Sequence, residues 1–248
     1  MSTSSATGHM QSALARSAVD YDRWLARTSP RAMLVRWLMS APAQLLTNGP
    51  ALRLPRQLQL GATTRMLDVA CGRGALMRAL DEQLHFDTPP VGIDCSRAAL
   101  ALATRNGAQA IRPRFVRGSG TSLPFRDGTF TFVTCGYVAR HLDDAELGAL
   151  LREILRVLEP RGLAVLWEFG PSGDRRLDAW NARVLSVTTS GPRLRSSATL
   201  RQMAAAAGFE FTRDANLRPF LFPPIARASV LLGRPPEGPP ERQPPAAR

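Results

Sequence analysis

The chain has 248 residues, of which 44% are hydrophobic and 21% are charged, and this composition excludes a wholly disordered protein. Its three cysteines include no CxxC pair, which excludes a disulfide framework and a zinc ribbon. The formal net charge is +12, yet all 32 basic residues are arginines dispersed along the chain. This pattern indicates a coding bias and disfavours nucleic acid as the substrate.

The sequence shows no membrane or export segment. No apolar run reaches the ~20 residues that cross a bilayer, because Arg36 interrupts the most apolar stretch, residues 32–38. The N-terminus lacks the basic segment and apolar core of a secretory signal. We therefore expect a cytoplasmic protein without a membrane span, and no group of residues predicts a metal site.

Composition divides the chain into four regions. Residues 1–10 are polar and residues 234–248 are rich in proline, so both are predicted to be disordered. Residues 11–60 have apolar side chains at helical spacing, interrupted by prolines, and are predicted to form a helical N-terminal extension or lid. Residues 61–233 are predicted to form the main domain.

From residue 65 onward, short apolar strands alternate with amphipathic helices. The predicted strands are residues 65–70, 90–94, 114–117, 130–135, 163–169, 209–213 and 226–232. The predicted helices are residues 75–84, 97–105, 143–158 and 198–207. This alternation predicts βαβ units with right-handed crossovers. The fold class is therefore α/β, a doubly wound, mostly parallel seven-stranded sheet with helices on both faces.

The turn after the first strand is the first candidate binding feature. Gly72 and Gly74 permit a tight turn and the close approach of a ligand to bare backbone, and Asp68 is an acceptor beside them. Met77 stands where a dinucleotide-binding turn has its third glycine, which argues against a pyrophosphate ligand. The alternative is a tight strand-to-helix turn that binds nothing.

A carboxylate at the end of the second strand is the second candidate feature. Asp94 stands where an acidic side chain can accept both hydroxyls of a ribose. An aspartate at a strand end can instead cap the next helix, but Ser96 is available for that task. The glycine turn and Asp94 together predict a nucleoside ligand without a pyrophosphate.

Four sequence blocks follow one another between residues 65 and 170: LDVACGRG, VGIDCS, GSGTSLPFRDGTF and EILRVLEPRGLAVLWEF. These blocks resemble the class I S-adenosylmethionine-dependent methyltransferases. The block that ends in Glu168 and Phe169 is similar to the subgroup that C-methylates quinone precursors, as is the pair Tyr21 and Asp22. The resemblance implies a Rossmann-like methyltransferase fold for residues 61–233 and S-adenosyl-L-methionine as the cofactor.

The resemblance also implies a set of cofactor-binding residues. The set comprises Tyr21, Asp68, Ala70, Cys71, Gly72, Gly74, Asp94, Cys95, Ser119, Gly120, Thr121, Cys135 and Gly136. In that family Asp68 and the glycine turn would surround the methionine end of the cofactor, and Asp94 would hold its ribose. The chain departs from the family at Ser119, where an acidic residue commonly meets the adenine, and at Ala70, where a glycine is often found.

His141 and Tyr137 both follow the fourth strand, and both are candidates for the catalytic step on the acceptor. A near-neutral intrinsic pKa would suit His141 for removing a proton. Its alternative role is to cap a helix or to lie at the edge of the core. The cysteines each follow a strand, and we interpret them as small buried side chains rather than a thiol cluster.

The side chains expected to cover the cofactor indicate the class of acceptor. They are Trp24, Met33, Leu34, Trp37, Leu38, Met39, Trp180, Val184 and Leu185. Such a cover suits a small, largely apolar molecule such as a quinone precursor, a polyketide or another secondary metabolite, methylated on carbon or oxygen.

Other functions stay open from the sequence. An RNA methyltransferase and a non-catalytic, cofactor-binding partner protein are alternatives. A NAD-dependent oxidoreductase is disfavoured by Met77 and by the lack of any lysine. The sequence leaves the oligomeric state undetermined.

Overall fold

The computed structural model describes residues 22, 49–105, 113–185, 193–215, 217 and 227–235. The first predicted disordered segment and most of the second, residues 236–248, lie outside the described residues. The predicted N-terminal extension also lies outside them, except for Asp22 and residues 49–60. Within the described ranges, no helix has both the length and the apolar character that a membrane span requires.

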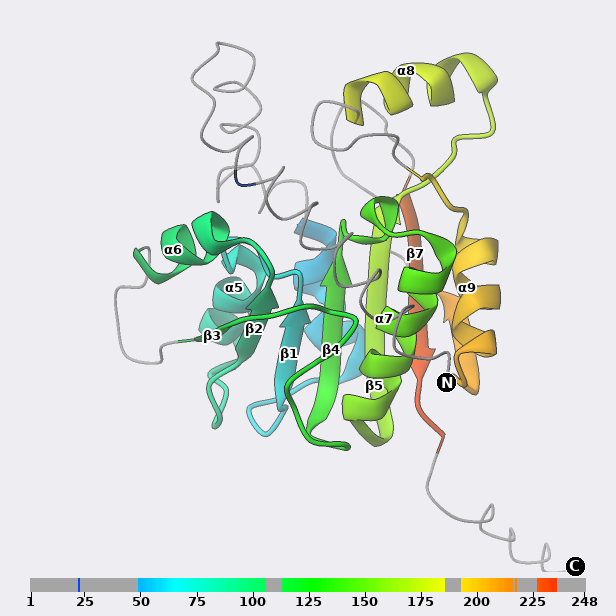
Figure 1. The fold of residues 1–248 in the computed structure, drawn as a ribbon. Coiled ribbons are helices and arrows are strands. Elements are labelled where there is room, and N and C mark those ends of the chain that lie inside the picture. The colour runs from blue at the N-terminus through cyan, green and yellow to red at the C-terminus, as the bar shows by residue number, and fades with distance from the viewer. Residues whose placement is uncertain are drawn as a thin grey trace, which may run out of the picture.

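A seven-stranded sheet forms the centre of the molecule (Figure 1). Its strands are β1 (Met66–Val69), β2 (Val91–Asp94), β3 (Arg114–Arg117), β4 (Phe130–Gly136), β5 (Leu158–Phe169), β6 (Phe211–Asp214) and β7 (Arg227–Gly233). The strand order is β3-β2-β1-β4-β5-β7-β6, with β1 to β5 parallel and β7 antiparallel to both of its neighbours. The predicted fold class is confirmed. The order reverses between β1 and β4, which places a crevice at their carboxyl ends.

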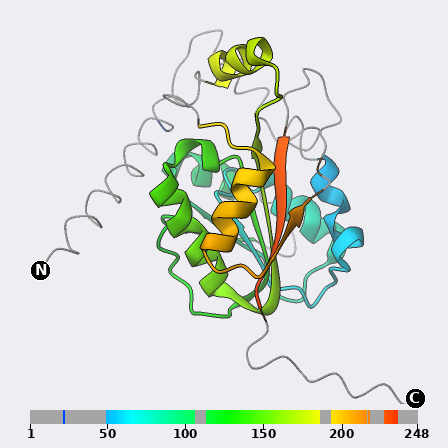
Figure 2. The ribbon, with the colours of Figure 1, turned by 90° about the vertical axis from the view of Figure 1, so that its right-hand side faces the viewer.

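Helices cover both faces of this sheet (Figure 2). The described helices are η1 (Gly49–Arg53), α4 (Leu54–Leu58), α5 (Ala75–Leu84), α6 (Arg97–Arg105), η2 (Ala139–His141), α7 (Asp144–Val157), α8 (Arg175–Leu185) and α9 (Ser197–Ala206). On one face, α7 and α9 bury Leu147, Ile154 and Leu200 against the sheet. On the other, Ala51 and Leu54 join the apolar cluster of α5 and α6. Residues 49–58 are therefore part of the domain core.

Local signals fix where several helices begin. Asp143 accepts a hydrogen bond from Glu146 N at 2.8 Å, and the Glu146 carboxylate accepts one from Asp143 N at 2.9 Å. This reciprocal pair is a capping box at the start of α7. Ser96 Oγ accepts from Ala99 N at 3.0 Å and caps α6, as the sequence predicts. Such caps explain why the predicted helices match the observed ones to within one or two residues.

The structure differs from the predicted elements at the start of β5. The sequence predicts a strand from residue 163, but β5 begins at Leu158. Leu158 pairs with Phe130 and Leu163 pairs with Phe132, so four residues of β5 bulge out of the register. Arg161 has a φ of 64° within this bulge. The turn that the sequence indicates is thus built inside the strand.

Helix α8 was not predicted from the sequence. Its segment RRLDAWNARVL has a low overall hydrophobicity, and sequence analysis treated it only as the stretch after the fifth strand. The helix begins where the Asp174 carboxylate accepts hydrogen bonds from Arg176 N at 2.7 Å and Leu177 N at 3.0 Å. It stands above the carboxyl end of the sheet rather than beside it (Figure 1).

Met77 stands where a third glycine would allow the helix and the strand to pack closely. Here Gly92 on the strand leaves the room that the Met77 side chain occupies. A Cβ atom on Gly92 would lie 2.6 Å from Met77 Sδ and 2.8 Å from Cys71 Sγ. The side chain of Met77 is completely buried. Helix α5 and strand β2 therefore approach closely through a glycine on the strand and a large side chain on the helix, which leaves no room for further atoms.

This contact predicts that Gly92→Ala destabilises the protein by about 1–3 kcal/mol, because the new methyl group overpacks the site. Urea denaturation measures the change. Gly148→Ala is the control: its Cβ would meet nothing closer than 3.4 Å, at the mobile end of Arg152, so helix propensity should stabilise α7 by about 0.5–1 kcal/mol. Equal stability of Gly92→Ala and wild type would contradict the packing argument.

Candidate functional site

The turn between β1 and α5 presents bare backbone to the crevice. Ala70, Gly72 and Gly74 all have positive φ, of 60°, 53° and 68°, and Gly74 N donates to Cys71 O at 2.8 Å. Alanine is strained at this φ, and Ala70 stands where the resemblance implies a glycine. A Cβ on Gly72 would meet no atom within 4 Å. The turn therefore leaves space for a ligand against its peptide groups.

Asp94 joins this turn to the end of β2. Its Oδ2 accepts a hydrogen bond from Gly72 N at 2.8 Å, and its Oδ1 accepts one from Ser96 N at 2.8 Å. Burial raises the pKa of Asp94, while these two donors oppose the rise. Each carboxylate oxygen can accept more than one hydrogen bond. Asp94 can thus hold the two turns together and still receive two hydroxyl groups from a ligand.

Asp68 lies near the end of β1, just before the glycine turn, and is 5% exposed. The Thr134 hydroxyl donates to its Oδ1 at 2.7 Å. Burial raises the pKa of Asp68 to about 7, the Thr134 hydrogen bond opposes this, and the negative charge of Asp94 adds to it. A positively charged ligand group beside Asp68 would stabilise its carboxylate form.

The loop after β3 lies beside Asp94 and offers hydroxyl groups. Ser119 Oγ is 2.8 Å from Thr121 Oγ1 and accepts a hydrogen bond from Thr121 N at 3.2 Å. Gly118 N donates to the Asp94 carbonyl at 3.0 Å. A Cβ on Gly120 would lie 2.9 Å from Leu150 Cδ1, so the loop packs closely on the sheet end. Where the predicted family commonly has a carboxylate, this chain has two hydroxyls.

The three cysteines are free thiols. Cys71 and Cys135 are buried, as predicted, whereas Cys95 is half-buried. Burial raises the pKa of Cys95 to about 12 and raises those of the other two thiols further. All three are therefore protonated at neutral pH and unreactive. Among the described residues no group of His, Cys, Asp and Glu is arranged to hold a metal ion.

The carboxyl end of β4 carries an aromatic cluster. A Cβ on Gly136 would lie 2.5 Å from the Trp167 ring, so only glycine fits there. Tyr137 has a φ of 59°, and its ring centre lies 4.8 Å from that of Phe169 and 6.4 Å from that of Trp167. Its hydroxyl accepts a hydrogen bond from Arg227. Desolvation raises the pKa of Tyr137 to about 12, so the hydroxyl stays protonated.

His141 ends η2 at the same edge of the sheet. Desolvation, aided by the positive charge of Arg140, lowers the pKa of His141 to about 3. The structure therefore does not give His141 the near-neutral pKa on which its predicted role as a base depends. At neutral pH the imidazole is uncharged and a weak proton acceptor. The predicted cofactor residue Tyr21 lies outside the described residues.

A buried ion pair links the ends of β4 and β5, and sequence reasoning missed it. Arg140 Nη1 donates to Glu168 Oε1 at 2.9 Å, and Arg140 N donates to Glu168 Oε2 at 3.0 Å. The side chains are 7% and 0% exposed. Arg140 also donates to the Tyr137 carbonyl at 2.8 Å. The signal was Glu168 within the apolar run LAVLWEF, because a buried carboxylate requires a cation.

Arg195 extends this network from the loop before α9. Its side chain is 6% exposed and donates to the carbonyls of Ala139 and Leu142 at 2.6 Å and 2.8 Å. It also pairs with Asp144 at 2.7 Å. Two buried arginines thus fix the loop that follows β4. Neither was singled out from the sequence, since dispersed arginines look alike until burial separates them.

Arg78 supports the glycine turn from behind. Its Nη1 donates to the Arg73 carbonyl at 2.9 Å, and its Nη2 donates to the Ala103 carbonyl near the end of α6. Its guanidinium lies 5.6 Å from the Phe115 ring centre on β3. One side chain therefore holds together the turn after β1, helix α6 and strand β3. Sequence analysis gave no sign of this role.

Asp22 is the one described residue that precedes residue 49. Its Oδ1 accepts hydrogen bonds from the Ser96 hydroxyl and, at 3.4 Å, from Ala98 N. The carboxylate therefore adds a second cap to α6, next to Asp94. Its negative charge contributes to the raised pKa of Asp94.

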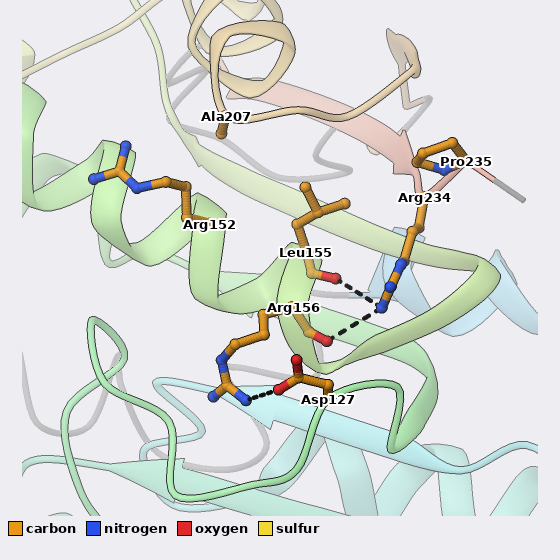
Figure 3. Close-up of a pocket in the computed structure, with 7 residues that line it drawn as sticks. All are labelled: Asp127, Arg152, Leu155, Arg156, Ala207, Arg234 and Pro235. Atoms are coloured by element: carbon orange, nitrogen blue, oxygen red, sulfur yellow. Dashed lines mark hydrogen bonds and ion pairs between the residues drawn. The ribbon is translucent and has the colours of Figure 1, made fainter. Parts of the chain in front are cut away.

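A pocket at the opposite, amino end of the strands does not compete with this site (Figure 3). It is lined by Asp127, Arg152, Leu155, Arg156, Ala207, Arg234 and Pro235. Arg156 donates to Asp127, Glu153 and two backbone carbonyls. Arg234 Nη1 donates hydrogen bonds to the carbonyls of Leu155 and Arg156 at the end of α7. These two guanidinium groups stabilise loop and helix ends, which is a structural task.

Comparison with known proteins shows what part of the chain is similar to. Residues 66–162 match a family described as a methyltransferase domain. The chain is 36% identical over 115 residues to demethylmenaquinone methyltransferase of Lactiplantibacillus plantarum, which covers 45% of this chain and 48% of that protein. It is 35% identical over 144 residues to the same enzyme of Thermus thermophilus, covering 58% and 63%. It is 34% identical over 113 residues to 2-phytyl-1,4-naphtoquinone methyltransferase of Thermosynechococcus vestitus, covering 46% and 48%.

The aligned region spans about half the length of most of these curated relatives. Solved structures share the fold at lower identity. A methyltransferase from Methanosarcina mazei described as SAM-dependent superposes with a TM-score of 0.59 at 20% identity, covering 73% of this chain and 97% of that one. The pyocyanin biosynthetic protein PhzM superposes with a TM-score of 0.65 at 21% identity, covering 86% and 61%. Both comparisons support the α/β architecture.

The buried ion pair predicts a strong stability effect. Glu168→Leu should destabilise the protein by about 3–5 kcal/mol, because Arg140 is left as an uncompensated buried charge. The double variant Glu168→Leu, Arg140→Met should lose less than Glu168→Leu alone. The control is Glu159→Gln, which breaks the exposed pair with Arg65 and should cost less than about 1 kcal/mol. A urea denaturation in which Glu159→Gln loses as much stability as Glu168→Leu, or more, would contradict this interpretation.

Proposed function

We propose that this chain, which carries a class I S-adenosylmethionine-dependent methyltransferase domain, methylates a small, largely apolar acceptor of the quinone-precursor class on carbon or oxygen. One observation carries the proposal: the Asp94 carboxylate is bonded to the glycine turn beside open space. This arrangement offers an acceptor for ribose hydroxyls next to peptide groups that can meet an amino acid end. The matching family and relatives support the same activity.

The residues present fit S-adenosylmethionine. Peptide N–H groups of the turn at Gly72 and Gly74 suit the carboxylate of its methionine part. Asp68 suits its ammonium group, since a buried carboxylate gains from a cation. Asp94 suits the ribose, and the hydroxyls of Ser119 and Thr121 suit the adenine amine. A ligand of this length follows the carboxyl ends of β1, β2 and β3, where these residues lie.

The cofactor supplies a methyl group bonded to a positively charged sulfur, which is a strong electrophile. The protein has to align the acceptor with that group and to exclude water. Gly136 and Tyr137 border the space after β4, and Arg140 with Glu168 holds their loop rigid. A buried, hydrogen-bonded network suits this task because it restrains the loop.

The acceptor class is argued from the aromatic cluster. At the carboxyl ends of β4 and β5, the Tyr137 ring lies tilted by 35° against Phe169 and meets Trp167 edge to face. Aromatic rings favour planar, apolar partners. Relatives named as acting on demethylmenaquinone and on 2-phytyl-1,4-naphtoquinone support a naphthoquinone-like ring. Tyr137 and His141 remain our proposed acceptor-side residues, with His141 acting as an uncharged hydrogen-bonding group.

Methyl transfer itself tests the proposed function. The purified chain is incubated with S-adenosylmethionine carrying a labelled methyl group and a 2-alkyl-1,4-naphthohydroquinone. We expect label in the organic phase and release of S-adenosylhomocysteine at the same rate. Tight cofactor binding without transfer to this compound would contradict the acceptor class, and failure to bind the cofactor would contradict the activity.

Removal of the Asp94 carboxylate should weaken cofactor binding. Asp94→Ala loses two charge-assisted hydrogen bonds, which corresponds to about 1.5–3 kcal/mol, or roughly a tenfold to hundredfold rise in Kd. Isothermal calorimetry with S-adenosylhomocysteine measures the change. Asp127→Ala, whose carboxylate is 75% exposed at the other end of the sheet, is the control. Unchanged affinity of Asp94→Ala would remove the ribose assignment.

The raised pKa of Asp68 predicts that cofactor affinity depends on pH. Below its pKa of about 7 the carboxyl is neutral, and above it the carboxylate attracts an ammonium group. Affinity should therefore rise between about pH 6 and about pH 8, and Asp68→Asn should abolish this rise. In the free protein the sign is opposite: the folded state holds this proton more tightly, so stability falls as pH rises toward 7.

Calorimetry in matched buffers at several pH values measures this dependence. A wild-type affinity that is flat over that range, or a slope that Asp68→Asn retains, would place the ammonium group elsewhere.

A further inference from the structure

Helix α8 lies at the same end of the molecule as the candidate site. It follows β5 after a five-residue connection that leaves the carboxyl end of that strand. Figures 1 and 2 both show it as the outermost described helix at this end, raised above the sheet. A large surface that approaches the molecule at this end therefore contacts α8 first among the described helices.

The helix has one exposed face. Arg175, Arg176, Ala179, Trp180 and Arg183 are exposed. Leu177, Asp178 and Ala182 are half-buried, and the Asn181 side chain is 0% exposed. At 100° per residue, the five exposed positions fall within one continuous sector, opposite Asn181. Exposure along α8 is thus periodic, as it is for a helix that lies on the protein with one side and faces outward with the other.

The chemistry of this face is a tryptophan among arginines. It carries three guanidinium groups and one indole ring, and none of its five side chains is acidic. The carboxylate of Asp178 lies off this face and accepts hydrogen bonds from Ser172. Trp180 is 48% exposed, and of the described residues only Phe211, on the edge strand β6, is a comparably exposed large hydrophobic side chain.

An exposed tryptophan beside arginines suits one particular surface. Indole rings favour the boundary between lipid headgroups and acyl chains, because one part of the ring is apolar and the N–H is polar. Arginine side chains are attracted to anionic headgroups. A helix with basic residues and tryptophan on one face is typical of segments that lie in the plane of a membrane surface. The net charge of +12 adds long-range attraction of the same sign.

We propose that the exposed face of α8, defined by Arg175, Arg176, Trp180 and Arg183, docks this protein on an anionic lipid surface. The inference rests on the proposed function, because a largely apolar acceptor partitions into lipid rather than water. Docking through α8 places the carboxyl ends of β4 and β5 next to that lipid. The acceptor then reaches the aromatic cluster without crossing the aqueous phase.

Co-sedimentation of the full chain with vesicles tests the docking without any substrate. We expect binding to vesicles of phosphatidylglycerol mixed with phosphatidylcholine, and weak binding to phosphatidylcholine alone. Added salt should weaken the binding, since screening reduces the attraction between arginines and headgroups. Equal binding to both vesicle types would overturn the proposal.

Variants locate the docking face. Arg175→Gln with Arg176→Gln should lower the partition coefficient roughly thirtyfold, since each basic residue near an anionic surface contributes about a fivefold factor. Arg105→Gln with Arg126→Gln removes the same charge from exposed positions elsewhere and should change binding much less. Trp180→Ala should lower binding several-fold, whereas Phe211→Ala should not. Equal losses in the target and control variants would show attraction by net charge alone and overturn the proposal.

Two readouts separate the possible failures. Cofactor affinity and thermal unfolding should be unchanged in all four variants, because the substituted side chains lie on the surface away from the glycine turn. Loss of vesicle binding with cofactor affinity retained supports docking, and vesicle binding without methyl transfer would count against the proposed function alone.

A gel shift with RNA is the last arm of the test. If Arg175 and Arg176 govern RNA binding and not vesicle binding, the surface is a nucleic-acid face and the lipid proposal fails.

Discussion

The hydrogen bond from Gly72 N to the Asp94 carboxylate is the contact on which the site depends. It joins the turns after two neighbouring parallel strands, so that a bare peptide surface and an acidic acceptor face the same crevice. Parallel strands place their carboxyl ends together, and this bond, with the one from Cys71 N to the Ile93 carbonyl at 3.1 Å, ties the first turn to the end of β2. Arg78 holds the same turn from the other side through the Arg73 carbonyl. The binding surface is thus supported from both sides before any ligand arrives.

Buried charges define the second half of the site. Arg140, Glu168 and Arg195 occupy the ends of β4 and β5 with little or no exposure. Burial of charges is costly unless each finds its partner, and here backbone carbonyls and N–H groups add to the ion pairs. These bonds restrain the loop after β4, next to an aromatic cluster. In the function that we propose, the polar half suits a nucleoside and the apolar half suits an acceptor.

Helix α8 connects this geometry to the surroundings of the protein. Its inward side includes a buried asparagine, while its outward side presents tryptophan and arginine. The opposite end of the sheet has a pocket lined by arginines too, but there the guanidinium groups of Arg156 and Arg234 are bonded to the protein itself. Arginines at the two ends of the sheet therefore lie in different surroundings, and we propose different tasks for them.

The sequence by itself determined the sheet, most helix limits and the glycine turn with Asp94, because periodicity and capping residues act over a few neighbours. It did not give α8, the bulge in β5 or the Arg140–Glu168 pair. From the sequence, only the near-neutral intrinsic pKa of His141 was known. In the folded protein, desolvation and the charge of Arg140 lower that pKa. These features depend on which distant side chains are buried together, and burial sets the cost of a charge. Only the tertiary structure decides that.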